Sequence, residues 1–398
     1  MSKVATHEDE TTTRSFVESE ELFHERAIRA AGLSDFGDPS YREGMRVALR
    51  ALDTEARLHE AGRASVRAGI VDMLTERLRS EEQLRRHPEV LQVPIPRPIF
   101  ITGCVRTGGT ALQYLMGADP ALQVLPAWLS AKPQPRPPRA TWESNPDFQA
   151  VQAGLDAYHA VDPRLQAMHF RAAAWPDECG PMMRQDFTDD YFEVVGTVPS
   201  YEHWFHDTRH PHTYIRHRKL VQLIGSTHPD RRWLFKYGAH LRELDTLLDV
   251  YPDACIVYVH RDPCEVISSY TGMVAIYRAL HERDIDRHDI ARTQMVAWGE
   301  ASNRALGIRD RHASTQFFDI YYEEFIADPV GSVKRIYAYF QQPLSAESEA
   351  ALNKHHANNP QHKHGKHQYS TAQTGLTERQ IRDAFGPYLE RYFPASGK

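Results

Sequence analysis

The most constraining stretch of this 398-residue sequence lies between residues 94 and 116. A proline-rich segment at 94–98 breaks any preceding helix, and a short apolar run of strand type follows at 99–102. A glycine-rich turn at 103–110 and a helical pattern at 110–116 come next. Strand, glycine-rich turn and helix in this order are typical of a phosphate-binding loop, where backbone N–H groups at the helix start converge on an anion.

Within this turn, residues 106–110 read Arg-Thr-Gly-Gly-Thr. Glycines let the backbone approach an anion closely, and Arg106 adds a permanent positive charge. The Gly-Lys-Ser/Thr ending of a Walker A loop is missing, so a nucleotide triphosphatase is disfavoured. A plain tight turn at Gly108 and Gly109 is the alternative interpretation.

Further apolar runs predict strands at 233–236, 255–260 and 317–322, with helical patterns between them. Strands that alternate with helices favour a parallel sheet. We therefore expect an α/β fold, with a P-loop-like parallel sheet flanked by helices.

The residues before the proline-rich segment predict helices only. From Val66 to Leu78 apolar side chains recur at i, i+4, i+7, i+8 and i+12, which places them on one helix face. The polar residues 1–14 predict a disordered tail. We expect a helical N-terminal extension at 15–95 and an α/β core at 96–398.

A second candidate anion site lies where the predicted strand 255–260 ends. Arg261 follows this strand directly, and Ser269 lies eight residues later, about two turns into a predicted helix. Ligands of open parallel sheets bind beyond the carboxyl ends of the strands, so Arg261 is well placed to bind one. A helix cap or a pair with a surface acid is the ordinary alternative for Arg261.

Together, the two motifs resemble the PAPS-dependent sulfotransferase family, and bacterial members in particular. In that family an Arg/Lys-Ser-Gly-Thr-Thr loop holds the 5′-phosphosulfate, and a later Arg with a Ser eight residues on holds the 3′-phosphate. Segments 234–241, 322–325 and 365–377 resemble the family as well. The resemblance spans about residues 20–395.

The resemblance implies a site for PAPS and its product PAP, with no metal expected. The cofactor-binding residues that it implies are Arg106, Thr107, Gly108, Gly109, Thr110, Arg261, Ser269, Tyr322 and Lys366. The sequence departs from the family pattern at Gly109, where a Thr is usual, and at Tyr237, where a Ser is usual.

Sulfuryl transfer needs cations at the leaving phosphate and a base at the acceptor. Arg106 and the loop amides suit the first need, and Lys236 at a predicted strand end adds charge on the bridging oxygen. His240 is our first choice as the base, because histidine titrates near neutral pH. Glu178 and His169 are the alternative bases.

Several other clusters have two interpretations each. The cysteines Cys104, Cys179 and Cys264 are expected to be buried small hydrophobes rather than nucleophiles. The histidines between 355 and 367 are expected in a solvated loop rather than at a metal. One aromatic-rich set either lines an acceptor pocket or fills a core: Tyr201, Trp204, Phe205, His206 and Tyr214.

The composition excludes several classes of partner. The net charge is −6, whereas a general nucleic-acid binder is usually basic, so no nucleic-acid partner is expected. The sequence contains no run of about 18 apolar residues, so no membrane span is expected. The polar N-terminus lacks the apolar core of a secretory signal, and four cysteines give no dense disulfide framework. The cytoplasm is therefore the expected compartment.

We predict a sulfotransferase that moves a sulfuryl group from PAPS to a hydroxyl or amine of a small-molecule acceptor. A homodimer is left open. The rival interpretations are the same fold with altered, non-sulfating chemistry such as elimination, a nucleotide-dependent kinase, and a nucleotide-binding protein without catalysis.

Overall fold

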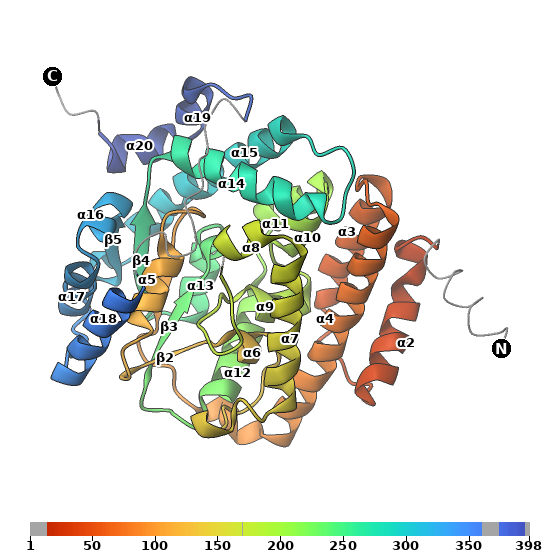
Figure 1. Ribbon diagram of the computed structural model, residues 1–398, viewed down its shortest axis with the longest axis horizontal. Helices are drawn as coiled ribbons and strands as arrows, with labels where there is room; N and C mark the ends of the chain where they lie inside the picture. Colours follow the sequence, from red (N-terminus) through yellow and green to blue (C-terminus); the bar gives the residue numbers. More distant parts are fainter. Residues whose placement is uncertain (1–13, 169, 360–373, 395–398) are drawn as a thin grey trace.

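The computed structural model describes residues 14–168, 170–359 and 374–394. At its centre lies a five-stranded sheet whose neighbouring strands are all parallel (Figure 1). The strands are β1 (Ile99–Thr102), β2 (Leu122–Val124), β3 (Arg232–Lys236), β4 (Cys255–His260) and β5 (Phe317–Tyr321). They lie in the order β2-β3-β1-β4-β5, so later strands flank β1 on both sides. The prediction of an α/β fold with a parallel sheet is confirmed.

Alternate side chains of β1 enter two buried clusters. Ile99 and Ile101 pack against α5 (Gly109–Met116) in the smaller cluster. Phe100 belongs to the larger cluster and stacks on Phe235 of β3, with the ring centroids 4.9 Å apart. Successive strand side chains point to opposite faces, so this division shows that helices cover both faces of the sheet.

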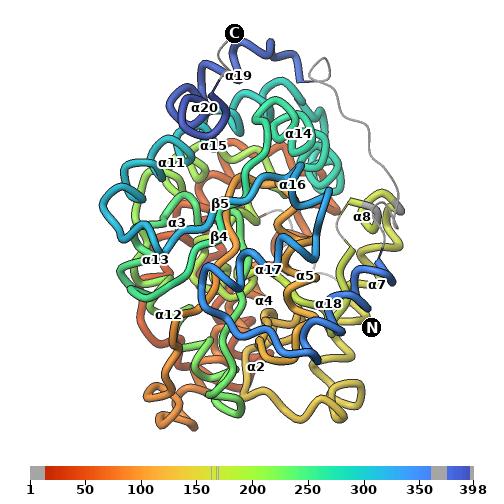
Figure 2. Tube along the Cα trace, turned by 90° about the vertical axis from the view of Figure 1, so that its left-hand side faces the viewer, coloured from red at the N-terminus to blue at the C-terminus, as the bar shows by residue number. Residues whose placement is uncertain are grey.

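The helices that follow surround this sheet. In chain order they are α6 (Ala127–Ala131), α7 (Pro146–Val161), α8 (Pro163–Met168), α9 (Gly180–Met183), α10 (Tyr191–Val195), α11 (Pro199–Asp207), α12 (Pro211–Gly225), α13 (Leu244–Val250), α14 (Pro263–Ala279), α15 (Arg287–Asp310), α16 (Tyr322–Ala327), α17 (Pro329–Tyr339), α18 (Ala346–Asn358), α19 (Glu378–Ala384) and α20 (Gly386–Tyr392). Helices α14, α15, α19 and α20 gather at one end of the molecule (Figure 1, Figure 2).

Three N-terminal helices, α2 (Glu20–Ala31), α3 (Tyr41–Thr54) and α4 (Glu60–Arg86), form the side of the molecule far from α17 and α18 (Figure 1). Their apolar side chains belong to the same buried cluster as Phe100. On α4, Arg77 is buried and pairs with Asp186. The N-terminal helices therefore share a continuous core with the sheet.

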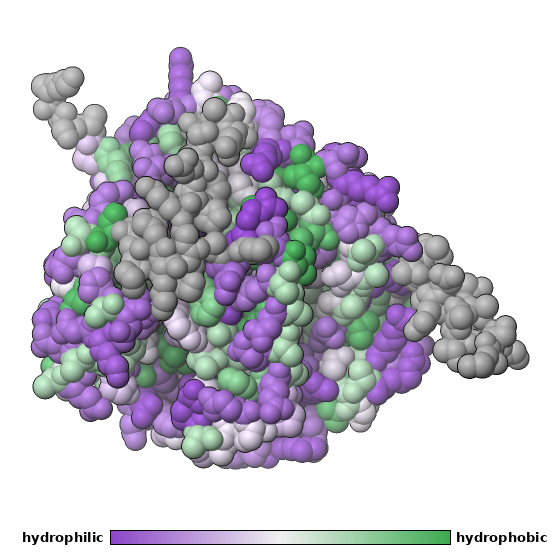
Figure 3. Space-filling model, in the orientation of Figure 1, coloured by the Kyte–Doolittle hydropathy of each residue, from purple (hydrophilic) through white to green (hydrophobic). Residues whose placement is uncertain are grey.

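The structure differs from the predicted elements in small ways. β2 was not predicted, and the strand predicted at 317–322 ends at Tyr321 because Tyr322 begins α16. No helix among the described residues is long and apolar enough to cross a membrane. On the face seen in Figure 3, hydrophilic and hydrophobic residues are interspersed.

Candidate active site

The loop at residues 103–108 joins β1 to α5 and needs glycine at two points. Gly103 has φ 140°, and a Cβ there would come within 2.5 Å of the Val259 carbonyl oxygen on β4. Gly108, the N-cap of α5, has φ 90°, and its Cβ would lie 2.9 Å from the ring of Tyr322. The tight turn places the free first N–H groups of α5 at the carboxyl edge of the sheet.

Two side chains of this loop have different tasks. Arg106 has φ 63°, which is uncommon for a residue other than glycine. Its Nε donates to the Ser269 hydroxyl at 3.1 Å, and its Nη1 donates to the carbonyl of Met168 at 3.2 Å. Thr107 is buried, and its hydroxyl donates to the carbonyl of Cys104 at 2.8 Å. Thr107 thus fixes the turn, while Arg106 reaches toward α14.

Arg261 joins the second motif to the first. Its Nη1 donates to the carbonyl of Arg106 at 2.8 Å, and its guanidinium lies 4.1 Å from the ring centroid of Tyr322. Its Nη2 also pairs with Glu265 at 2.6 Å. The structure therefore brings together Arg106, Arg261, Ser269 and Tyr322 from three separate segments.

Lys236 is the last residue of β3 and pairs with Glu178. Both side chains are only partly buried. The segment that carries Glu178 is fixed at two places, because Gln113 Nε2 donates to the carbonyl of Asp177 at 2.9 Å and the Cys179 N–H donates to the Lys236 carbonyl at 3.4 Å. The ammonium of Lys236 and the carboxylate of Glu178 thus face each other at the end of β3, next to the 103–108 loop.

The departure at Gly109 has a steric reason. A Cβ at this position would lie 3.3 Å from Lys236 Cε and 3.4 Å from Ile101 Cγ2. A larger side chain would crowd the stem of Lys236. Glycine therefore lets this lysine run past the start of α5.

His240 has a different environment from the one expected of a base. It is fully buried, and its Nδ1 hydrogen-bonds the Tyr214 hydroxyl at 3.0 Å. Its ring packs edge-on against Phe100, with the centroids 5.3 Å apart. Burial lowers the pKa of His240 well below its usual value, with smaller contributions from His217 and Lys236. The structure thus places His240 in the core, whereas Glu178 lies at the partly open edge.

Other candidate residues have various positions. Thr110 lies in the first turn of α5. His355 and His356 lie in the last turn of α18 and not in the loop expected for them. His169, Lys366 and the histidines at 362, 364 and 367 lie outside the described residues. Cys104 and Cys179 are buried, as expected, whereas Cys264 is only partly buried; burial raises the pKa of all three thiols.

Of the two interpretations left open for the aromatic-rich set, the structure supports the core. Tyr201, Phe205, His206 and Tyr214 are buried, and Trp204 packs against the same cluster. A different aromatic set, not identified from the sequence, is joined by ring contacts and includes two tyrosines whose pKa is raised by the charge of Glu178. It consists of Tyr114, Tyr158, Phe170, Trp175 and Tyr277.

Contacts and charges tie this set to the site. The Tyr114 hydroxyl donates to the carbonyl of Phe170 at 2.9 Å. Burial raises the pKa of Tyr114 and of Tyr277, and the negative charge of Glu178 adds to both shifts. Two spacings carried a signal for these residues, since Tyr114 lies one turn beyond Thr110 and Tyr277 two turns beyond Ser269.

This chain is similar to known proteins. The family model described as "Sulfotransferase family" matches residues 98–346. The chain belongs to the sulfotransferase family. The structure of sulfotransferase STF1 from Mycobacterium tuberculosis is 37% identical, with a TM-score of 0.85 over 94% of this chain and 99% of that one. Sulfotransferase STF9 from Mycobacterium avium is 28% identical, with a TM-score of 0.86 over 94% and 96% of the two chains.

A curated sulfotransferase is also similar to this chain. It is the omega-hydroxy-beta-dihydromenaquinone-9 sulfotransferase Stf3 of Mycobacterium bovis and Mycobacterium tuberculosis, 25% identical over 181 residues. The match covers 45% of this chain and 42% of the relative, so it spans less than half the length of these curated relatives. These matches favour sulfuryl transfer over the kinase and elimination alternatives.

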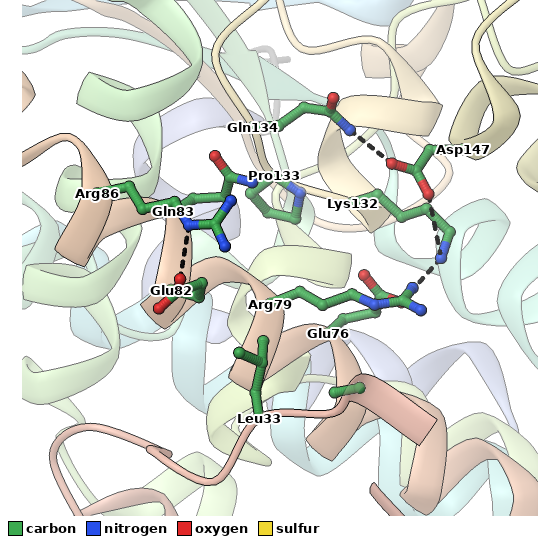
Figure 4. A pocket seen from close by; sticks show the side chains of 11 residues that line it. Leu33, Glu76, Arg79, Glu82, Gln83, Arg86, Lys132, Pro133, Gln134 and Asp147 are labelled. Carbon is green, nitrogen blue, oxygen red and sulfur yellow. Dashed lines mark hydrogen bonds and ion pairs between the residues drawn. The ribbon is translucent and has the colours of Figure 1, made fainter. Parts of the chain in front are cut away.

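A separate pocket of about 240 Å³ lies between α4 and residues 131–147, away from the residues of the sulfotransferase motifs (Figure 4). Its charged side chains already pair with one another. Lys132 pairs with Glu76 at 2.8 Å, and Arg86 pairs with Glu82 at 2.6 Å. Among the described residues, no group of three or more His, Cys, Asp or Glu side chains is arranged to hold a metal ion.

Proposed function

We propose that this chain transfers the sulfuryl group of PAPS to a hydroxyl or amine of a small-molecule acceptor, with PAP as the second product. The proposal depends on one observation. Two sets of residues, each with at least one cationic side chain, lie at the carboxyl edge of β3, β1 and β4. Lys236 and the start of α5 form one group. Arg106, Arg261 and Ser269 form the other.

These residues fit a nucleotide that carries two separate anionic groups. The loop amides and Lys236 would hold the 5′-phosphosulfate, as helix N-termini bind phosphate elsewhere. Arg261 and Ser269 would hold the 3′-phosphate, and the ring of Tyr322 beside Arg261 suits contact with the adenine. When bound, PAPS supplies a sulfuryl group activated by its phosphate leaving group.

Lys236 and the first N–H groups of α5 stabilise the charge that develops on the leaving phosphate. Their positions are fixed before reaction by β3 and by the tight turn at Gly108. Preorganised cations and N–H donors at the atom that gains charge lower the barrier. Positioning and electrostatics together account for the catalysis that this chemistry needs.

We assign the base to Glu178 in place of His240. The acceptor proton passes to a Glu178 carboxylate oxygen while the acceptor oxygen or nitrogen bonds to sulfur and the bond from sulfur to the leaving oxygen breaks. Glu178 is partly open to solvent beside Lys236, so an acceptor can reach it. Protonated His240 would be a charge inside the core, which is costly.

The aromatic set that includes Tyr114 and Tyr277 supports an acceptor with an apolar body and one reactive hydroxyl or amine. Stf3 is named for a hydroxylated menaquinone derivative, which is a compound of this kind. The four cysteines are free thiols, which supports a cytoplasmic location. We propose no nucleic-acid partner and no metal, and a homodimer stays open.

The first test is thermal unfolding with PAP, ATP or 5′-AMP, without added metal. A ligand at about 100 times its Kd adds roughly 2.7 kcal/mol to the folded state. We expect stabilisation by PAP above that by the other two nucleotides, followed by formation of a stable sulfate ester from PAPS in an acceptor panel. Equal shifts with all three nucleotides, or a desulfated elimination product, would contradict the proposal.

A further inference from the structure

Tyr237, the residue after Lys236, is joined to Asp190 by two hydrogen bonds. Its side chain is buried, and its hydroxyl donates to Asp190 Oδ1 at 2.9 Å. The backbone N–H of Asp190 donates back to the same hydroxyl at 3.2 Å. The hydroxyl is therefore fixed in direction, and the bulky side chain has a defined partner.

The same tyrosine packs against the segment that carries Glu178. A Cβ on Gly180 would lie 3.4 Å from Tyr237 Cε2, which is ordinary van der Waals contact. The neighbouring Cys179 N–H is bonded to the Lys236 carbonyl. Residues 178–180 thus lie against both the ring of Tyr237 and the backbone of Lys236.

Negative charge is concentrated around Asp190. Burial raises its pKa to about 7, and the carboxylates of Asp189, Glu178 and Glu193 add to the rise. The charged and titratable groups that face Asp190 are Asp189, Glu178, Glu193, Arg184, Arg242, Tyr201, Tyr237 and Tyr270. Those that face Glu178 are Lys236, Asp190, Cys179, Tyr114, Tyr237 and Tyr277.

We propose that Tyr237 and Asp190 are positioning residues for the Lys236–Glu178 pair, and that the tyrosine hydroxyl favours the ionised form of Asp190, in which the segment that carries Glu178 is correctly placed. A hydrogen bond to a carboxylate is stronger than one to a neutral acid, so Tyr237 stabilises the ionised Asp190. The kcat should therefore depend on the ionisation of Asp190, because transfer needs Glu178 and Lys236 in the correct positions. The inference rests on the proposed sulfotransferase function.

Tyr237→Phe tests the hydrogen bond. Loss of a hydrogen bond to a charged group costs about 1.5–3 kcal/mol, so the ionisation of Asp190 should move to higher pH by about one to two units. We expect the rise of kcat with pH to move by the same amount, while the KM for PAPS stays close to that of the wild type. Asp190→Asn keeps an oxygen for Tyr237 but removes the charge, and we expect it to abolish this rise.

Tyr270→Phe is the matched control. Tyr270 is also buried beside Asp190, but its hydroxyl has no hydrogen-bond partner within the described ranges. Removal of this hydroxyl should leave the dependence of kcat on pH unchanged. A Tyr237→Phe profile that overlays the wild type, or an Asp190→Asn variant that keeps the rise, would overturn the inference.

A readout that needs no turnover separates this inference from the proposed function. Carboxyl NMR of ¹³C-labelled aspartate, with PAP present, follows the titration of Asp190 in the wild type and in Tyr237→Phe. An upward shift in the variant supports the hydrogen-bond role, and identical titrations overturn it. A wild type that forms no sulfate ester with any acceptor overturns the proposed function instead.

Discussion

Arg261 is the residue on which the nucleotide assignment depends most, because it contacts the loop backbone and the ring of Tyr322 at once. Arg261→Ala should weaken PAP binding by about 10- to 150-fold, the worth of one charge-assisted hydrogen-bonded pair. Isothermal titration calorimetry measures this directly. Arg379→Ala, at a side chain that is 90% exposed, is the control and should bind PAP as the wild type does.

Substitutions of Glu178 and of His240 are expected to have opposite effects on kcat. Glu178→Gln keeps the size of the side chain but removes the proton acceptor, so kcat should fall by about 10²- to 10⁴-fold with PAP affinity retained. His240→Gln keeps a partner for the Tyr214 hydroxyl and should retain turnover. Steady-state kinetics well below the unfolding temperature distinguish the two, and the reverse result would return the base to His240.

At the scale of the element, the start of α5 requires a glycine at position 108. Gly108→Ala places a Cβ at φ 90° and 2.9 Å from the Tyr322 ring, which should cost about 1–3 kcal/mol of unfolding free energy and weaken PAP binding. Gly154→Ala is the control, because its Cβ on α7 would meet nothing within 4 Å. That change should stabilise the helix by about 0.5–1 kcal/mol. Chemical denaturation checks both, and equal effects would contradict the steric argument.

The sequence predicted those elements whose signal is local. β1 and β4 are continuous apolar runs next to strong turn signals, and both appear in the structure where they were expected. β2 is only three residues long and pairs with β3 alone, so no periodic pattern can reveal it. The fold class followed from the alternation of elements and did not need β2.

For the site, spacing located residues but not the faces they occupy. Arg261 and Ser269 follow from a strand end and a helical interval, and the structure places both beside Arg106. His240 follows Lys236 by only four residues, but the turn of residues 238–241 directs it into the core. Similarly, the spacing of Tyr114 from Thr110 carried a signal, but the burial of Tyr201 in the core depends on tertiary packing that the local sequence does not show.

At the scale of the whole molecule, buried histidines make the fold sensitive to acid. Burial lowers the pKa of His217 to about 3, so the unfolded chain binds a proton below pH 6.5 that the folded chain does not. The contribution of His217 to stability is complete above pH 6.5 and is lost as the pH falls. Between pH 7 and pH 5 this loss amounts to about 2 kcal/mol.

His217→Phe should therefore lose about 2 kcal/mol less than the wild type between pH 7 and pH 5. Urea denaturation at the two pH values measures the difference. Glu202 and Glu243, whose pKa values are raised by burial to about 8 and about 7, act in the opposite direction, but they cancel in this comparison. His203→Asn, at a side chain that is 82% exposed, should show the wild-type loss.

The buried Arg77 has a consequence for protein engineering. Its guanidinium donates to the carbonyls of Phe36 and Asp38 and pairs with Asp186, four residues before Asp190. A chimera can replace the N-terminal helices with those of a relative. Its 184–190 segment will keep this structure only if Arg77 and Asp186 are exchanged together. Grafts that separate the arginine from its aspartate leave a buried charge without its counterion and should fail to express as folded protein.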